Sequence, residues 1–304
     1  MATPTSTSTS TTTTGQFVLQ IVGITDGKII NRPSAKFPLE MISDVWLTKD
    51  NKQVLAHTPS MGCAGLAEAG NDVLVAYCPN DEINTGLEIF SHTVFLSVFK
   101  ENEVNEQIIA LHPNIAMELI ESIIEKNLIS ALPPVKQFKR YVPMKMEGKV
   151  DSCFSFVGIC EDDIPFVMEV NNVPFAEYNH GEELAASAGA PDSADSAATT
   201  DSAEWNTKTA YFPEKNKNTT DLIKRIKDLT MIRSESMVRC FIAYVIERTD
   251  IDKFEFSMYD NAYRAAVKEA IETGVDIVPI VISWTKEGIA FFVTDELSIV
   301  YPQI

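Results

Sequence analysis

Two acidic residues in neighbouring hydrophobic runs have the types and spacing to share a metal ion. Asp151 lies in the run 149–157, and Glu169 lies in the run 165–171. Both runs are rich in the β-branched and aromatic residues typical of strands. Adjacent antiparallel strands would bring the two carboxylates to neighbouring strand ends. Since hard divalent cations take carboxylate and water oxygens as ligands, the pattern predicts a Mg²⁺ or Mn²⁺ site held by Asp151 and Glu169.

Asn171 stands where such a site would need a cation. An acidic residue followed two positions later by lysine is the signature of metal-dependent nucleases of the restriction-endonuclease type, whose lysine polarises the attacking water. Here Glu169 is followed by Asn171, whose amide carries no charge. We therefore predict a degenerate catalytic group of Asp151, Glu169 and Asn171, with Glu214 as a further acid on its rim. The alternative is that these acids are ordinary solvated residues at strand ends.

Bulk composition narrows the class of protein. The chain has 304 residues, enough for two domains that each bury a core. No run approaches the eighteen apolar residues needed to span a bilayer, so no membrane association is expected. The five cysteines are odd in number and contain no C-x-x-C pair, which favours a reducing cytoplasm or nucleus. Residues 1–15 are almost entirely Thr and Ser and are predicted to be a disordered tail, with a plastid-targeting segment as the alternative.

The charge distribution gives conflicting indications about nucleic acids. The formal net charge is −18, whereas a general nucleic-acid binder is expected to be basic. Seven of the 43 acids fall in the base-free, low-complexity stretch that we predict as a disordered insertion at about residues 177–206. Basic residues nevertheless cluster before and after the acidic pair. The predicted nucleic-acid contacts are Lys139, Arg140, Lys149, Lys215, Lys217, Lys224 and Arg225, with Lys136 and Lys145 in the same cluster; solvated faces are the alternative account.

Periodicity divides the chain into two parts. Residues 16–102 contain short strands at about 17–22, 44–48, 54–57, 72–78 and 93–99, which predict a small β-barrel of the OB type. From 103 to 304, helical stripes at 114–127, 222–229 and 261–273 alternate with strands. The order helix, three strands, helix, strand is that of the restriction-endonuclease core. It places Asp151 and Glu169 on the second and third strands of an α/β domain.

Short motifs along the chain resemble those of the sugar fermentation stimulation protein A (SfsA) family. The segment 56–62 is similar to A-H-x-P-N-T-G, and 111–114 contains the family's L-P-N with an inserted His112. Residues 149–151 resemble R-x-D, 169–174 resemble E-V-K-x-V-T, and 211–214 resemble F-P-D. Residues 272–276 are similar to the closing helix–Gly–strand element. The departures fall on the chemistry, at Asn171, Pro174 and Glu214.

The resemblance implies an OB-like N-terminal domain, a nuclease-like C-terminal domain and DNA binding with little sequence preference. Three functions follow as hypotheses. The first is a DNA-binding protein with a degenerate nuclease-like site and no enzymatic activity. The second is a Mg²⁺-dependent nuclease in which Lys149 or Lys215 replaces the missing lysine. The third is a protein-interaction module that has lost DNA binding, which the net charge favours.

Overall fold

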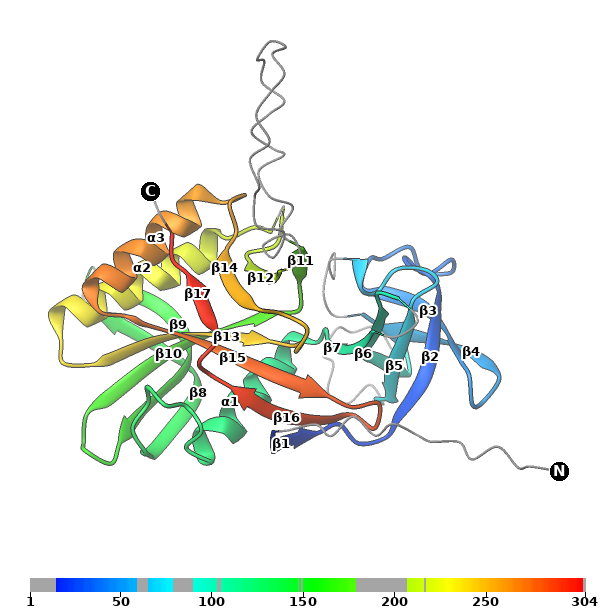
Figure 1. Ribbon diagram of the computed structural model, residues 1–304, viewed down its shortest axis with the longest axis horizontal. Coiled ribbons are helices and arrows are strands. Elements are labelled where there is room, and N and C mark those ends of the chain that lie inside the picture. Colours follow the sequence, from blue (N-terminus) through cyan, green and yellow to red (C-terminus); the bar gives the residue numbers. More distant parts are fainter. Residues whose placement is uncertain are drawn as a thin grey trace, which may run out of the picture.

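The computed structural model describes residues 15–58, 65–78, 90–102, 105–146, 148, 150–178, 207–215 and 217–302. Within them a β-rich ring lies beside a larger α/β part (Figure 1). The predicted fold class is confirmed: mostly strands, with an N-terminal ring of sheet and a C-terminal α/β part. No helix in these ranges is long and apolar enough to cross a membrane.

The α/β part is built on a seven-stranded sheet whose centre is parallel. Strands β10, β13 and β15 run parallel to one another, and the outer strands are antiparallel to their neighbours. Parallel strands covered on both faces require nearly continuous apolar sequence, and the side chains of β13 are almost all buried. The order across the sheet is β1 (Gln16–Gln20), β16 (Ile289–Thr294), β15 (Asp276–Trp284), β13 (Arg239–Ile246), β10 (Pro165–Val173), β9 (Val150–Cys160) and β8 (Val135–Met146).

Three helices cover the two faces of this sheet (Figure 1). Helix α1 (Pro113–Glu125) packs on one face with Phe241 and Ala243 of β13, while α2 (Thr220–Glu235) and α3 (Asn261–Thr273) pack on the other with Ile242 and Tyr244. This alternation follows from the two-residue period of a strand. All three predicted helices are present. A smaller four-stranded sheet beside α2 and α3 contains β11 (Ala176–Tyr178), β12 (Lys208–Phe212), β14 (Lys253–Phe256) and β17 (Ser298–Val300).

The N-terminal ring differs from the predicted barrel in its membership. Its order is β4 (Lys52–His57), β3 (Ile42–Leu47), β2 (Ile24–Asn31), β5 (Asp72–Tyr77), β6 (His92–Lys100) and β7 (Glu106–Ala110), and β4 also pairs with β6 to close it. The predicted first strand belongs instead to the other domain, because β1 pairs with β16. The predicted boundary at 102/103 is also wrong, since β7 is a strand of the ring.

Strand β2 was not predicted, because it contains Asp26-Gly27, a pair typical of turns. Close packing explains why residue 27 of this strand is a glycine. A Cβ at Gly27 would lie 2.7 Å from the Val45 Cγ1 atom on the paired strand β3. The close approach of two strands inside a small ring therefore selects glycine there.

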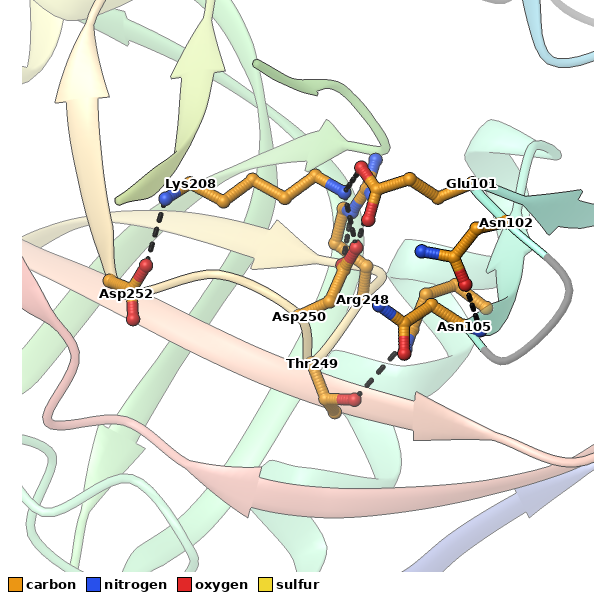
Figure 2. Close-up of polar contacts among 9 residues, drawn as sticks. Glu101, Asn102, Asn105, Lys208, Arg248, Thr249, Asp250 and Asp252 are labelled. Atoms are coloured by element: carbon orange, nitrogen blue, oxygen red, sulfur yellow. Dashed lines mark hydrogen bonds and ion pairs between the residues drawn. The ribbon is translucent and has the colours of Figure 1, made fainter. Parts of the chain in front are cut away.

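A cluster of buried charges joins the two domains (Figure 2). We call Glu101, Lys208, Arg248 and Asp250 the interdomain charge cluster. The Lys208 ammonium lies 2.8 Å from Glu101, in the turn after β6, and 2.6 Å from Asp250, between β13 and β14. Arg248 donates two hydrogen bonds of 2.6 Å to Asp250. The side chains of Lys208 and Arg248 are only 6% and 3% exposed, so the ring is fixed to the α/β part by desolvated ion pairs.

The predicted acidic insertion lies mostly outside the described residues, but its two ends are adjacent. Tyr178 pairs with Lys208 in the antiparallel ladder of β11 and β12. The predicted start at 177 is wrong by two residues, because Glu177 and Tyr178 belong to β11.

Since the chain leaves and returns at one hairpin end, we expect that replacing residues 180–206 with a short Gly-Ser turn leaves the thermal midpoint nearly unchanged. Scanning calorimetry would measure it. An extended deletion that also removes Tyr178, whose ring lies 5.1 Å from the Lys208 ammonium, should lower the midpoint. A cooperative loss of structure in the shorter deletion would contradict the prediction.

Candidate nuclease-like site

Glu169 is the centre of the candidate site. It lies in β10, with its side chain 5% exposed, on the face of the sheet that α2 covers. Burial raises the pKa of its carboxyl, and the nearby Arg225 guanidinium and the Ser155 hydrogen bonds oppose that rise. A buried carboxylate persists as an anion only where such partners compensate for the lost hydration.

Ser155 is the residue that lies across from Glu169. The pairing of β9 with β10 places Phe156 opposite Met168, so the next positions along the two strands are Ser155 and Glu169. The Ser155 hydroxyl donates to Glu169 Oε2 at 3.1 Å and accepts from the Val170 N–H at 3.0 Å. A neutral hydroxyl therefore occupies the place where a second metal-binding carboxylate was predicted.

Arg225 supplies the positive charge of the site from helix α2. Its Nε lies 2.6 Å from Glu169 Oε1. An arginine guanidinium remains charged at all ordinary pH values and has no acceptor, so it can neither take a proton nor bind a metal. Asn171, two residues along β10 from Glu169, is buried and neutral.

The prediction that Asp151 and Glu169 lie side by side is wrong. Asp151 lies four residues from Ser155 along β9, which is about 13 Å of extended strand. Its carboxylate pairs with Lys145 at 3.5 Å, and both side chains are mostly exposed. The strand assignments were correct but the register was not, because the spacing of 18 residues between the two acids did not reveal where the β9–β10 turn falls.

The donor set at Glu169 does not fit a divalent cation. Hard cations bind several oxygen ligands, usually including more than one carboxylate. Here one carboxylate is ion-paired with Arg225 and is flanked by neutral Ser155 and Asn171. Over the described ranges no group of three or more His, Cys, Asp or Glu side chains is placed to hold a metal.

An open cavity of about 390 Å³ lies between β8, β9 and α2, at the end of β9 that carries Asp151. Its polar lining comes from Lys145, Asp151, Lys224 and Asp228. The Lys224 ammonium donates to Asp228 at 2.8 Å, to the Ser152 hydroxyl at 3.0 Å and to the Asp151 carbonyl. Lys224 thus fixes α2 against β9, and the two cations of the cavity lining are each paired with one of its two carboxylates.

Comparisons with known proteins agree with this architecture. Residues 200–288 match the family described as "Sugar fermentation stimulation protein RE domain". The fold is similar to that of the SfsA protein of Pyrococcus furiosus, solved in complex with Ca²⁺, with a TM-score of 0.65 and 14% sequence identity over 94% of this chain and 99% of that chain. The chain as a whole thus has the fold of an SfsA protein, and its residues 200–288 match the SfsA family. No curated protein gives a significant match.

The remaining predicted catalytic acid does not join the Glu169 group. Glu214 follows β12 and lies 3.8 Å from the Lys217 ammonium. The Lys215 ammonium lies over the ring of Tyr259 at 5.3 Å from its centre. The cation beside Glu169 is instead Arg225, which the sequence had suggested only as a nucleic-acid contact.

The predicted nucleic-acid contacts separate into internal and exposed residues. Arg140 forms an ion pair with Glu121 of α1, and Arg225 with Glu169, so neither guanidinium points freely to solvent. Lys139 is exposed on β8, and Lys149 lies outside the described residues. The residues missed by the predicted site are Ser155 and the exposed Tyr141 of β8. Recognising Ser155 would have required the hairpin register, and recognising Tyr141 would have required its exposure.

Proposed function

We propose that this protein belongs to the SfsA family and binds DNA without hydrolysing it. The absence of catalysis rests on one observation: Glu169 is ion-paired with Arg225 and faces a neutral Ser155. Metal-assisted phosphodiester hydrolysis needs an ion to polarise the phosphate or generate the nucleophile, and this donor set does not suit one. The second hypothesis, a relocated catalytic lysine, gains no support, because the cation beside Glu169 is an arginine.

The strand β8 supports DNA binding. It contains four basic residues and no acidic one, in a chain whose net charge is −18. Arg140 is held by Glu121, whereas the pairs of Lys136 with Asp163 and of Lys145 with Asp151 are exposed, so a phosphate can compete for both lysines. It forms one edge of the seven-stranded sheet, next to the strand that carries Ser155 and next to the cavity. A basic strip of this kind attracts a phosphate backbone whatever the base sequence, even on an acidic protein.

A salt titration tests DNA binding. We expect labelled DNA to bind at 50 mM salt and to dissociate as salt rises, because each phosphate contact releases counterions. Lys139→Ala or Lys145→Ala should each reduce the slope of log K against log salt by roughly one unit. Lys268→Ala, an exposed lysine on α3, is the matched control and should leave the slope unchanged. Failure of the protein to bind DNA at 50 mM salt would favour the third hypothesis, a protein-interaction module.

Cleavage and metal binding are measured in parallel on the same preparation. The Pyrococcus relative was solved with Ca²⁺, so Ca²⁺ and Mg²⁺ are the ions to test by calorimetry. We expect neither measurable affinity at Glu169 nor DNA cleavage with Mg²⁺ or Mn²⁺. Metal-dependent cleavage that is abolished by Glu169→Gln would overturn the non-enzymatic proposal.

A further inference from the structure

Exposed residues on β8 combine positive charge with an aromatic ring. Lys139, Tyr141 and Lys145 are all exposed, whereas Arg140 pairs with Glu121 of α1. The strand changes face at Tyr141, since Phe138 packs in the core below α1 and Met144 packs in the core below α2. In the described ranges β8 pairs only with β9, so its other edge is open. The strand therefore presents an exposed tyrosine with an exposed lysine on either side of it along the chain.

Tyr141 combines an exposed ring with an unusual backbone conformation, at the point where β8 changes the face that it buries. Its side chain is 55% exposed. Its φ of 51° lies in the left-handed region, which β-strands do not use and which is unfavourable for a residue with a side chain. Backbone conformations of this kind persist where the surroundings enforce them, often at binding sites.

The position of Tyr141 connects it to the nuclease-like site. Arg140 pairs with Phe156 and Val142 pairs with Phe154, so Tyr141 lies across from Ser155. Ser155 in turn bonds Glu169 on the next strand. Tyr141, Ser155 and Glu169 form one row across three strands, and the tyrosine is its outer, solvent-exposed end.

We propose that Tyr141 is a stacking platform for a base of single-stranded DNA, with Lys139 and Lys145 on the flanking phosphates. This deepens the DNA-binding function proposed above and rests on it. Proteins that bind single strands combine a basic track with aromatic rings on which bases stack. The faces of bases within a duplex are covered by their neighbours, so an exposed ring favours a single strand. The ion pair of Lys145 with Asp151 is long and solvated, and a phosphate can replace the carboxylate at little cost.

The test compares dissociation constants for a short single strand and for the matching duplex, measured by fluorescence anisotropy. Tyr141→Ala should weaken single-strand binding about tenfold and duplex binding much less. Tyr141→Phe retains the ring and should bind as the unmodified protein does. Tyr301→Ala removes a tyrosine that is 52% exposed next to β17, and as the matched control it should have no effect.

Tyr141→Gly separates stacking from folding. Glycine accepts a positive φ without strain, so this variant should be at least as stable as the unmodified protein but should lose single-strand binding like Tyr141→Ala. If the unmodified protein binds DNA and Tyr141→Ala binds the single strand equally well, the stacking proposal is wrong while the proposed function stands. If the unmodified protein binds no DNA at all, both are wrong.

Discussion

Replacing Lys208 with methionine should lower the free energy of unfolding by roughly 1–3 kcal/mol, because it removes a buried ammonium from two half-buried carboxylates. Methionine keeps most of the apolar stem, so the change isolates the ammonium group. In its absence Glu101 and Asp250 lose the cation that lies 2.8 and 2.6 Å from them in the interdomain charge cluster (Figure 2). Urea denaturation of the two proteins measures the difference.

Lys100 provides the matched control for this experiment. Its ammonium lies 2.9 Å from Asp72, at a distance like those in the cluster, but its side chain is 52% exposed. Breaking an exposed ion pair lowers the free energy of unfolding only slightly, because water replaces the lost partner. Lys100→Met should therefore cost far less than Lys208→Met. Equal losses in the two variants would show that burial of the cluster has no energetic consequence.

The pH dependence gives a second signature of the same cluster. The hydrogen bond from Lys208 lowers the pKa of the Glu101 carboxyl below its usual value. A lowered folded-state pKa contributes stability above the unfolded pKa and loses it as pH falls through the folded pKa. The difference between the unmodified protein and Lys208→Met should thus be full at neutral pH and should shrink below pH 4.

The elements of the fold were largely predictable from the sequence, and the exceptions have physical causes. Both ends of helix α3 were predicted correctly. The sequence has a glycine directly after the helix, and Gly274 adopts the left-handed conformation that terminates helices, with φ of 94°. Strand β1 was recognised as a strand but assigned to the wrong domain. Its partner β16 lies more than 250 residues away, and hydrophobic pattern alone does not identify the partner of a strand.

The candidate site was predictable only in part, because its contacts also join residues that are far apart in the chain. Glu169 and Asn171 were placed on the correct strand. The second acid was assigned to Asp151 because an acidic residue was expected, whereas the hairpin register brings Ser155 to Glu169. The partner Arg225 comes from α2, 56 residues later in the chain. A long-range contact of that kind leaves no local pattern, so the ion pair that closes the site became evident only in the folded structure.

Replacing Glu247 with glutamine should stabilise the protein by roughly 3–5 kcal/mol at pH 8–9 and by little at pH 5. Glu247 follows β13 and is fully buried. Burial raises the pKa of its carboxyl to about 8, and the hydrogen bond from Trp284 only partly opposes this rise. A raised folded-state pKa contributes stability that is fully present below the unfolded pKa of ~4.3 and is lost as pH rises through about 8. Glutamine cannot ionise, so the variant avoids this loss.

The geometry around Glu247 makes glutamine a close replacement. Trp284 Nε1 donates to Glu247 Oε2 at 2.7 Å, and a glutamine carbonyl can accept the same bond. Glu247 Oε1 is buried without a hydrogen-bond partner among the described residues, so an amide nitrogen there replaces a group that is already unsatisfied. Urea denaturation at pH 5, 7 and 9 measures the effect, with the exposed Glu296→Gln as a control that should show no pH-dependent difference. The stability of the unmodified protein should fall between pH 5 and 9, and that of Glu247→Gln should fall much less. Equally steep losses in the two proteins would show that Glu247 does not remain protonated in the folded state. The buried charge would then need a partner cation that the described residues do not provide.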